Sequence, residues 1–216
     1  FNKSYLSYHY PLISFDMKKH IQIKVCLLGS SGVGKSSLLK RFVVNEFEEN
    51  EQTTLGAAYQ DKNFEYKGNT YKFQIWDTAG QEKYAPLAQM YYRDAKVAIL
   101  VYDITNKDSY STLKEWHREL GDKGPKDLIT CVVGNKCDLE DQEEVESNTA
   151  KTYAKSIDAL FGLTSAKENR GVNELFTKIC DLYEKGAGPD SSPSRPKGNT
   201  LDLSKKGADT SKCPCQ

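Results

Sequence analysis

The stretch GSSGVGKSS at residues 29–37 constrains the fold of this chain more than any other part of it. It begins where the apolar run IQIKVCLLG ends, which reads as a strand buried on both faces. Apolar residues then recur at helical spacing, at Leu38, Leu39, Phe42 and Val43. The stretch therefore joins a strand to a helix, and residues 29–36 match the pattern G-x-x-x-x-G-K-[ST] in the setting that supports it.

A loop of this kind is built to hold phosphate groups. Its glycines let the backbone N–H groups converge on phosphate oxygens, and the helix N-terminus adds partial positive charge. Lys35 can reach the β- and γ-phosphates, while Ser36 offers a hydroxyl to Mg²⁺. A chance glycine-rich turn is the alternative, and the order of strand, loop and helix disfavours it. The predicted phosphate-binding residues of the loop are Ser31, Gly32, Val33, Gly34, Lys35, Ser36 and Ser37.

Further apolar runs indicate the fold class. KVAILVYD at 96–103, LITCVVGN at 128–135 and the shorter DALFGLTS at 158–165 read as buried strands, with helical patterns between and after them. Two β-rich runs flank Lys67-Gly68-Asn69 as a hairpin. We predict an α/β fold: a doubly wound, mostly parallel six-stranded sheet with one antiparallel edge strand, and with ligands beyond the carboxyl ends of the strands.

Two short motifs indicate which base of a nucleotide is bound. GNKCD at 134–138 follows a buried strand, and TSAK at 164–167 ends the last short one. A carboxylate at Asp138 could accept from two guanine nitrogens and so reject adenine, while the Ala166 backbone N–H could meet the guanine oxygen. The loop alone would also allow an ATP-driven phosphotransferase, which Asn135 and Asp138 oppose. The predicted guanine-binding residues are Asn135, Lys136, Asp138, Ser165, Ala166 and Lys167.

The stretch WDTAGQE at 76–82 also ends a strand, which places Asp77 near the metal and Gly80 where its N–H can reach a γ-phosphate. Together with the phosphate loop, NKCD and TSAK, it resembles the Ras-like small GTPases over residues 20–185. LGAAY, KFQIW, KYAPL, YYRDA and LVYDIT are similar to the Rab family within them, and TTLGAAY and PLAQMYYR look most like its early-endosome subgroup. This resemblance implies the P-loop small GTPase fold.

The resemblance also implies residue roles. Thr54 would join Ser36 on Mg²⁺ and contact the γ-phosphate, Asp77 would bind the metal through a water, and Gln81 would be the catalytic residue that orients the attacking water. Rabs present an aromatic trio to effectors, matched here by Tyr59, Trp76 and Tyr91, although the family usually has Phe at the first position.

Arginine is absent between residues 46 and 80, where a GTPase with its own arginine finger would carry one. We therefore expect slow intrinsic hydrolysis, on the order of 10⁻⁴ to 10⁻³ s⁻¹, and acceleration by a GTPase-activating protein. A nucleotide-dependent scaffold that does not hydrolyse GTP is an alternative, which Gln81 opposes.

The two ends of the sequence read differently from residues 17–185, the expected GTPase domain. Residues 1–16 read as a non-native or disordered extension before Met17, and residues 186–216 as a disordered hypervariable tail. The terminal CPCQ resembles a doubly geranylgeranylated C-x-C end, with Cys213 and Cys215 as lipidation sites. Pro214 disfavours the C-a-a-X alternative, and no second C-x-C supports a zinc site.

Composition and the resemblance together define the expected partners. Thirty basic and thirty acidic residues cancel, so no overall basic field favours nucleic acid. The remaining cysteines form no evident disulfide framework, which fits a reducing compartment. The expected partners are GTP and GDP, an exchange factor, a GTPase-activating protein, a GDP-dissociation inhibitor, Rab effectors, and a membrane through prenyl groups. The expected location is the cytoplasmic face of endosomal membranes, cycling with cytosol, and the alternative is a Ras-like signalling GTPase at another membrane.

Overall fold

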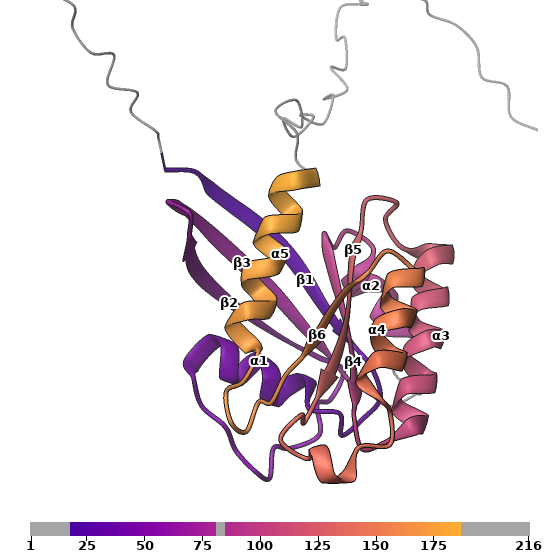
Figure 1. Cartoon of the computed structure of the whole chain (residues 1–216). Helices are drawn as coiled ribbons and strands as arrows, with labels where there is room; N and C mark the ends of the chain where they lie inside the picture. The colour runs from indigo at the N-terminus through magenta and orange to yellow at the C-terminus, as the bar shows by residue number, and fades with distance from the viewer. Residues whose placement is uncertain (1–17, 81–84, 187–216) are drawn as a thin grey trace, which may run out of the picture.

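The computed structural model describes residues 18–80 and 85–186. Six strands form one sheet in the order β2-β3-β1-β4-β5-β6 (Figure 1). Neighbouring strands are parallel except β2, which pairs antiparallel with β3 at the sheet edge. This confirms the predicted fold class. The strands are β1 (His20–Leu28), β2 (Ala57–Tyr66), β3 (Asn69–Thr78), β4 (Val97–Asp103), β5 (Ile129–Asn135) and β6 (Leu160–Leu163).

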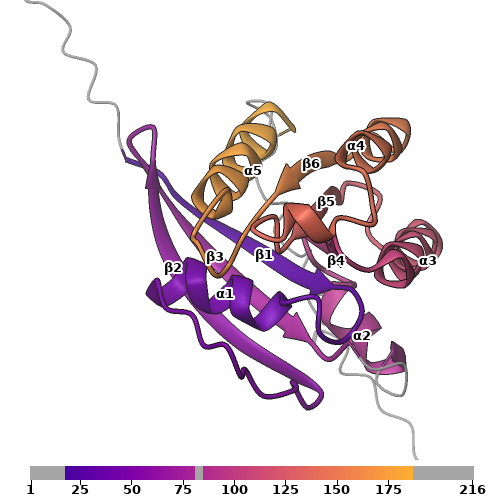
Figure 2. The same ribbon diagram turned by 60° about the horizontal axis from the view of Figure 1, so that its bottom comes forward.

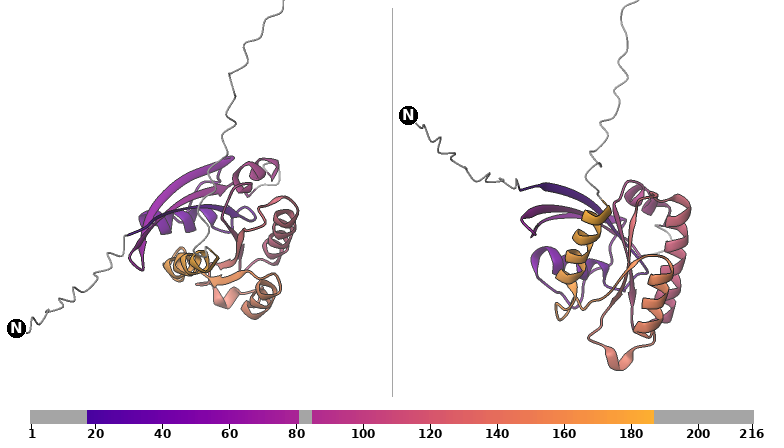
Figure 3. Two further views of the ribbon diagram at one scale, coloured as in Figure 1. Left: turned by 90° about the horizontal axis from the view of Figure 1, so that it is seen from above. Right: turned by 45° about the horizontal axis from the view of Figure 1, so that its top comes forward.

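Helices cover both faces of the sheet. α1 (Lys35–Val44) and α5 (Val172–Gly186) pack on one face, and α2 (Ala85–Tyr92), α3 (Lys107–Lys123) and α4 (Ser147–Ser156) pack on the other, as Figures 2 and 3 show. A 3₁₀ turn, η2 (Glu140–Gln142), follows β5. Within residues 18–80 and 85–186, no helix combines the length and apolar character that crossing a bilayer requires. The predicted extension 1–16 lies outside the described residues, and so does the predicted tail 186–216 apart from Gly186, which is the last residue of α5.

The three-layer arrangement explains why the strand sequences are continuously apolar. Along β1, Val25 and Leu27 point into the cluster under α1 and α5, while Cys26 and Leu28 point into the cluster under α3. Each of these side chains is at most 1% exposed, as is expected where helices cover both faces of a sheet.

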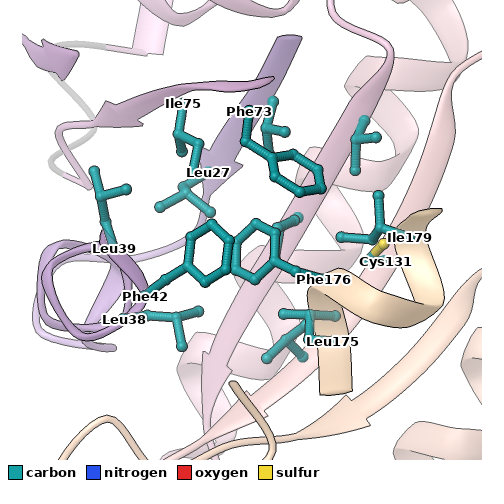
Figure 4. Packing of buried hydrophobic residues seen from close by; sticks show 14 of the residues in the cluster. Leu27, Leu38, Leu39, Phe42, Phe73, Ile75, Cys131, Leu175, Phe176 and Ile179 are labelled. Atoms are coloured by element: carbon teal, nitrogen blue, oxygen red, sulfur yellow. The ribbon is translucent and has the colours of Figure 1, made fainter. Parts of the chain in front are cut away.

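Aromatic packing holds α1 against α5. The rings of Phe42 and Phe176 stack with their centroids 3.4 Å apart, and Phe73 of β3 contacts both rings (Figure 4). The helix that follows the phosphate loop is therefore fixed to the last helix of the domain through the core.

The hairpin between β2 and β3 turns at the predicted residues. Lys67 and Gly68 have φ values of 47° and 78°, the left-handed pair of a type I′ turn, whose twist matches that of the flanking strands. β2 is thereby set antiparallel to β3 at the edge of the sheet.

The four nucleotide-binding motifs of the sequence analysis lie at the carboxyl ends of parallel strands. β1 leads into residues 29–34, β3 into residues 79 and 80, β5 into residues 136–138 and β6 into residues 164–167. α5 runs from this edge to the opposite end of the domain (Figure 1). The fold therefore gathers the predicted site at one end and the start of the C-terminal tail at the other.

Candidate nucleotide site

A cavity of about 470 Å³ lies at the carboxyl edge of the sheet. It brings together the phosphate loop, Thr54, Gly80 and both predicted guanine motifs. The predicted residues that line it are Ser31, Gly32, Gly34, Lys35, Ser36, Ser37, Thr54, Gly80, Asn135, Lys136, Asp138, Ala166 and Lys167. The cavity lies where ligands bind in doubly wound sheets.

Two glycines fit the phosphate loop against its neighbours. A Cβ at Gly29 would lie 2.2 Å from the Val101 carbonyl oxygen, and one at Gly34 would lie 2.4 Å from the Asn135 amide nitrogen. Gly34, with φ 91°, is the N-cap of α1 and provides no side-chain cap. The first N–H groups of α1 therefore lack a capping side chain, which leaves a helix N-terminus suited to an anion.

Lys35 lies folded over its own loop. Its ammonium donates to the carbonyl oxygens of Gly29 at 2.8 Å and Ser30 at 2.9 Å, and the residue is 5% exposed. Burial lowers the pKa of this amine to about 8, with Asp77 acting in the opposite direction. A phosphate in the cavity would give the ammonium the negative partner that its buried position lacks.

Val33 belongs to the loop that was predicted to bind phosphate through backbone N–H groups, and its side chain lies in the core. It is 1% exposed and packs in the cluster under α1 and α5. Its carbonyl oxygen accepts a hydrogen bond from the Asn135 side chain at 2.9 Å. Only its backbone N–H remains for a phosphate, consistent with how such loops bind their ligand.

The three predicted metal ligands meet in space. Ser36 Oγ donates to Asp77 Oδ2 at 2.5 Å and lies 2.8 Å from Thr54 Oγ1, which lies 3.2 Å from the same carboxylate oxygen. Asp77 Oδ1 is buried without a partner among the described residues, and burial raises the pKa of this carboxyl. Two hydroxyls and a carboxylate are hard oxygen ligands of the kind that Mg²⁺ prefers, so these residues fit the ion.

Gly80 brings the end of β3 against the phosphate loop. A Cβ at this position would lie 2.3 to 2.5 Å from backbone atoms of Ser30 and Ser31, so only glycine permits the approach. Gly80 also lines the cavity, and the contact of its N–H with a γ-phosphate stays a prediction. Gln81 lies outside the described residues, and its catalytic role stays a prediction.

Side chains hold the base end of the cavity in place. Ser165 Oγ donates to Asp138 Oδ1 at 2.5 Å, and Lys136 forms a 2.7 Å ion pair with Asp103. Lys136 adopts a left-handed backbone with φ 64°. The carboxylate predicted to read guanine is thus oriented by the second motif.

The buried Asn135 side chain forms hydrogen bonds to two loops of the protein. Its side-chain nitrogen donates to the Val33 carbonyl, its oxygen accepts from Thr164 Oγ1 at 3.1 Å, and the residue is 2% exposed. It joins the phosphate loop to both guanine motifs, so the geometry supports a positioning role for this residue. Its amide nitrogen has a second hydrogen and the residue lines the cavity, so its contact with guanine stays a prediction.

The predicted effector aromatics form a continuous strip over β2, β3 and α2. Ring centroids lie 5.1 Å apart both between Tyr59 and Trp76 and between Trp76 and Tyr91. Tyr59 is 44% exposed. The lipidation sites Cys213 and Cys215 lie outside the described residues.

Sequence reasoning missed part of the cavity wall. Apart from Leu139 after NKCD, the missed residues precede Thr54, and their only signal is that position, because no motif marks them. The missed lining residues are Phe47, Glu48, Glu49, Glu51, Gln52, Thr53 and Leu139.

Comparison with known proteins decides the family. A model of the Ras family matches residues 24–185. The chain belongs to the Ras family. It is 51% identical to Ras-related protein Rab-22A of mouse and of human over 158 residues, which cover 73% of this chain and 81% of the relative. It is 49% identical to rat Ras-related protein Rab-31 over the same shares. The predicted Rab-type small GTPase, which hydrolyses GTP to GDP, is confirmed, and the comparisons do not favour the alternative of a Ras-like signalling GTPase.

Proposed function

We propose that this Rab-type GTPase is a membrane-tethered GTP/GDP switch that recruits effectors in endosomal vesicle trafficking. The observation that carries the proposal is the contact of Thr54 with Ser36 and Asp77. It joins the segment before β2 to the phosphate loop and to β3, so the position of that segment depends on what the loop holds. The similarity to Rab-22A and Rab-31 supports the endosomal assignment.

Each end of the cavity has its own task in this proposal. Asp138, oriented by Ser165, would accept from guanine, and the Ala166 N–H would donate to the guanine oxygen. Lys35 and the N–H groups at the start of α1 would hold the phosphates. Bound Mg²⁺ would supply positive charge to the β- and γ-phosphates, with Ser36, Thr54 and Asp77 holding it.

The switch follows from what Thr54 contacts. With a γ-phosphate present, the Thr54 hydroxyl and the Gly80 N–H would both be engaged. Thr54 precedes Tyr59 in the chain and Gly80 lies between Trp76 and Tyr91, so losing the phosphate would release segments that adjoin these three aromatics. Effectors would read the strip only in its ordered form.

The tether would leave from the far end of the domain. α5 ends at Gly186, opposite the cavity. Geranylgeranyl groups on Cys213 and Cys215 would attach the chain stably, since two lipid chains are needed for stable anchoring. An exchange factor, a GTPase-activating protein and a GDP-dissociation inhibitor complete the proposed cycle at the cytoplasmic face of endosomes.

Single-turnover GTP hydrolysis by the full chain tests the proposal. Gln81→Leu should slow phosphate release by about tenfold or more, because the attacking water loses its positioning group. Ser36→Asn should weaken GTP binding more than GDP binding. Unchanged hydrolysis with Leu at position 81 would refute the catalytic assignment, and endosomal staining that survives Cys213→Ser with Cys215→Ser would refute the tether.

A further inference from the structure

One arginine of α1 is bonded to the loop that carries the second guanine motif. Arg41 Nε donates to the carbonyl oxygen of Ala166 at 2.7 Å, and Nη2 donates to that of Lys167 at 3.1 Å. Nη1 donates to the Asn45 carbonyl oxygen at 2.8 Å, at the end of α1. The guanidinium therefore spans the distance between the helix that follows the phosphate loop and the loop after β6.

The hydrogen bonds from Arg41 lie next to the Ala166 N–H, which is proposed to contact guanine. Ala166 is 3% exposed and lines the cavity. Across the described part of the chain, its N–H donates to no protein acceptor, whereas the N–H of Ser165 donates to the Arg170 carbonyl and that of Glu168 donates to Ser165 Oγ. The N–H of Lys167 likewise has no acceptor among the described residues, so the loop leaves the adjacent N–H groups of Ala166 and Lys167 for a ligand.

Holding a carbonyl oxygen also orients the rest of the residue. The peptide unit is planar, so a residue can turn only about φ and ψ. Arg41 fixes the peptide planes that follow Ala166 and Lys167, and the Ser165–Arg170 pairing fixes the plane that precedes Ala166. The Ala166 N–H lies in the same plane as the Ser165 carbonyl, which accepts from the Arg170 N–H, so this pairing sets its direction. Arg41 restrains it from the other side, by fixing the peptide plane that follows the Ala166 Cα.

A lysine could not replace this contact. The guanidinium is a planar fork whose donors diverge in fixed directions, while an ammonium is a point donor on a flexible stem. Three separate carbonyl oxygens, on residues 45, 166 and 167, are satisfied here by one planar group.

We propose that Arg41 is a positioning residue for guanine recognition, which holds the Ala166 N–H where the base oxygen O6 is bound. The proposal rests on the guanine site proposed above and extends it to a residue outside the cavity lining. Arg41 itself touches no base atom in this account and acts through the loop.

Nucleotide preference of the full chain tests the role. Arg41→Gln should release GDP roughly tenfold faster, the scale of losing hydrogen bonds to a charged group. Its preference for GDP over 6-thioguanosine diphosphate should shrink, because sulfur replaces O6 as a poor acceptor. Its preference for GDP over inosine diphosphate should persist, because that analogue lacks only the amino group read by Asp138. For Arg41→Lys, the GDP release rate and the preference for GDP over 6-thioguanosine diphosphate should lie between those of the wild type and those of Arg41→Gln.

Controls separate this role from general stability. Arg118→Gln removes an exposed arginine of α3 and should keep the wild-type release rate and both preferences. An Arg41→Gln chain that melts earlier but keeps both preferences would overturn the positioning role. A wild-type chain that binds GDP no better than ADP would overturn the guanine site itself, and this inference with it.

Discussion

Asn135 shows how one buried side chain can join loops that are far apart in the sequence. Its amide donates to Val33 in the phosphate loop and accepts from Thr164 before the second guanine motif. Gly34 must lack a side chain for this amide to fit, since a Cβ there would lie 2.4 Å from it. The motif residue thus sets the spacing between the two ends of the cavity.

We predict that Asn135→Ala destabilises the domain by about 1–3 kcal/mol, because it leaves the Val33 carbonyl and the Thr164 hydroxyl without partners. GDP and GTP affinity should fall together, since the phosphate and base ends lose their common support. Urea unfolding and nucleotide titration measure both effects. Asp138→Ala is the matched comparison: it should reduce the preference for guanine with a smaller loss of stability. Equal affinities for wild type and Asn135→Ala would contradict the role.

Tyr59 is the residue at which this chain departs from the usual Rab trio. Its ring packs on Trp76 at 5.1 Å, as a phenylalanine ring could, and it is 44% exposed. The difference is therefore the hydroxyl, which adds a donor and acceptor to an otherwise apolar strip. The departure leaves the stacking geometry intact and changes only the chemistry that a partner meets.

At the scale of elements, the β2–β3 hairpin is fastened to the last turns of α5. Tyr66 OH donates to Asp181 Oδ1 at 2.9 Å, and Lys67 Nζ forms a 2.6 Å ion pair with the same oxygen. Tyr71 OH donates to Glu184 on the next turn. The hairpin bears part of the effector strip, so α5 fixes one end of the strand pair whose other end faces the cavity.

This contact predicts a pH dependence. Lys67 and then Tyr66 hold the pKa of Asp181 below its usual value of 3.8, with Lys185 acting in the same direction. A lowered folded-state pKa gives stability that is fully present above the ordinary pKa and is lost as pH falls through the lowered one. Asp181→Asn should therefore reduce the urea midpoint at neutral pH, and the difference from wild type should vanish well below pH 3.8.

The control for that measurement is Asp122→Asn. Asp122 is an exposed aspartate of α3 that forms no ion pair within residues 18–80 and 85–186. Its replacement should leave the urea midpoint unchanged across the same range. A deficit of Asp181→Asn that persists into acid would mean that the asparagine disturbs packing and that the carboxylate charge is not the cause.

Most elements could be predicted from sequence because their signals are local. Apolar runs in the sequence predict the buried strands, and Lys67-Gly68 forms the left-handed turn that a hairpin needs. α4 gave a weaker signal, because its buried residues are the small Ala150 and Ala154. A stripe of alanines lacks the contrast with polar positions that marks an amphipathic helix.

In the site, too, the residues with a local sequence signal could be predicted and the others could not. Residue types that must touch phosphate or metal carry motifs, and the structure brings Ser36, Thr54 and Asp77 together as predicted. The roles of Asn135 and Arg41 depend on which carbonyl lies within reach of a side chain. Such contacts join residues as far apart as 41 and 166, and no local pattern in one sequence encodes that distance.

At the scale of the whole molecule, the cavity spans two halves of the sheet. The metal ligands and phosphate loop belong to the half formed by β2, β3 and β1, and both guanine motifs belong to the half formed by β4, β5 and β6. A bound nucleotide would therefore bridge the halves. It would also give partners to charged groups that are buried without a ligand, above all Lys35 and Asp77.

Ligand removal should consequently affect the domain as one unit. We predict that GDP with Mg²⁺ raises the free energy of unfolding by about 2.7 kcal/mol at a free concentration of 100 times Kd, in a single transition that shifts with GDP concentration. A chelator should reverse part of this shift, because the phosphates and Asp77 then face each other without the ion. Thermal unfolding with and without EDTA measures it, and Asp77→Asn should lose the chelator-sensitive part while retaining a response to GDP. If EDTA does not change the melting temperature of the wild-type GDP complex, a metal held by Ser36, Thr54 and Asp77 is contradicted. If unfolding shows two separate transitions, a nucleotide that bridges the two halves of the sheet is contradicted.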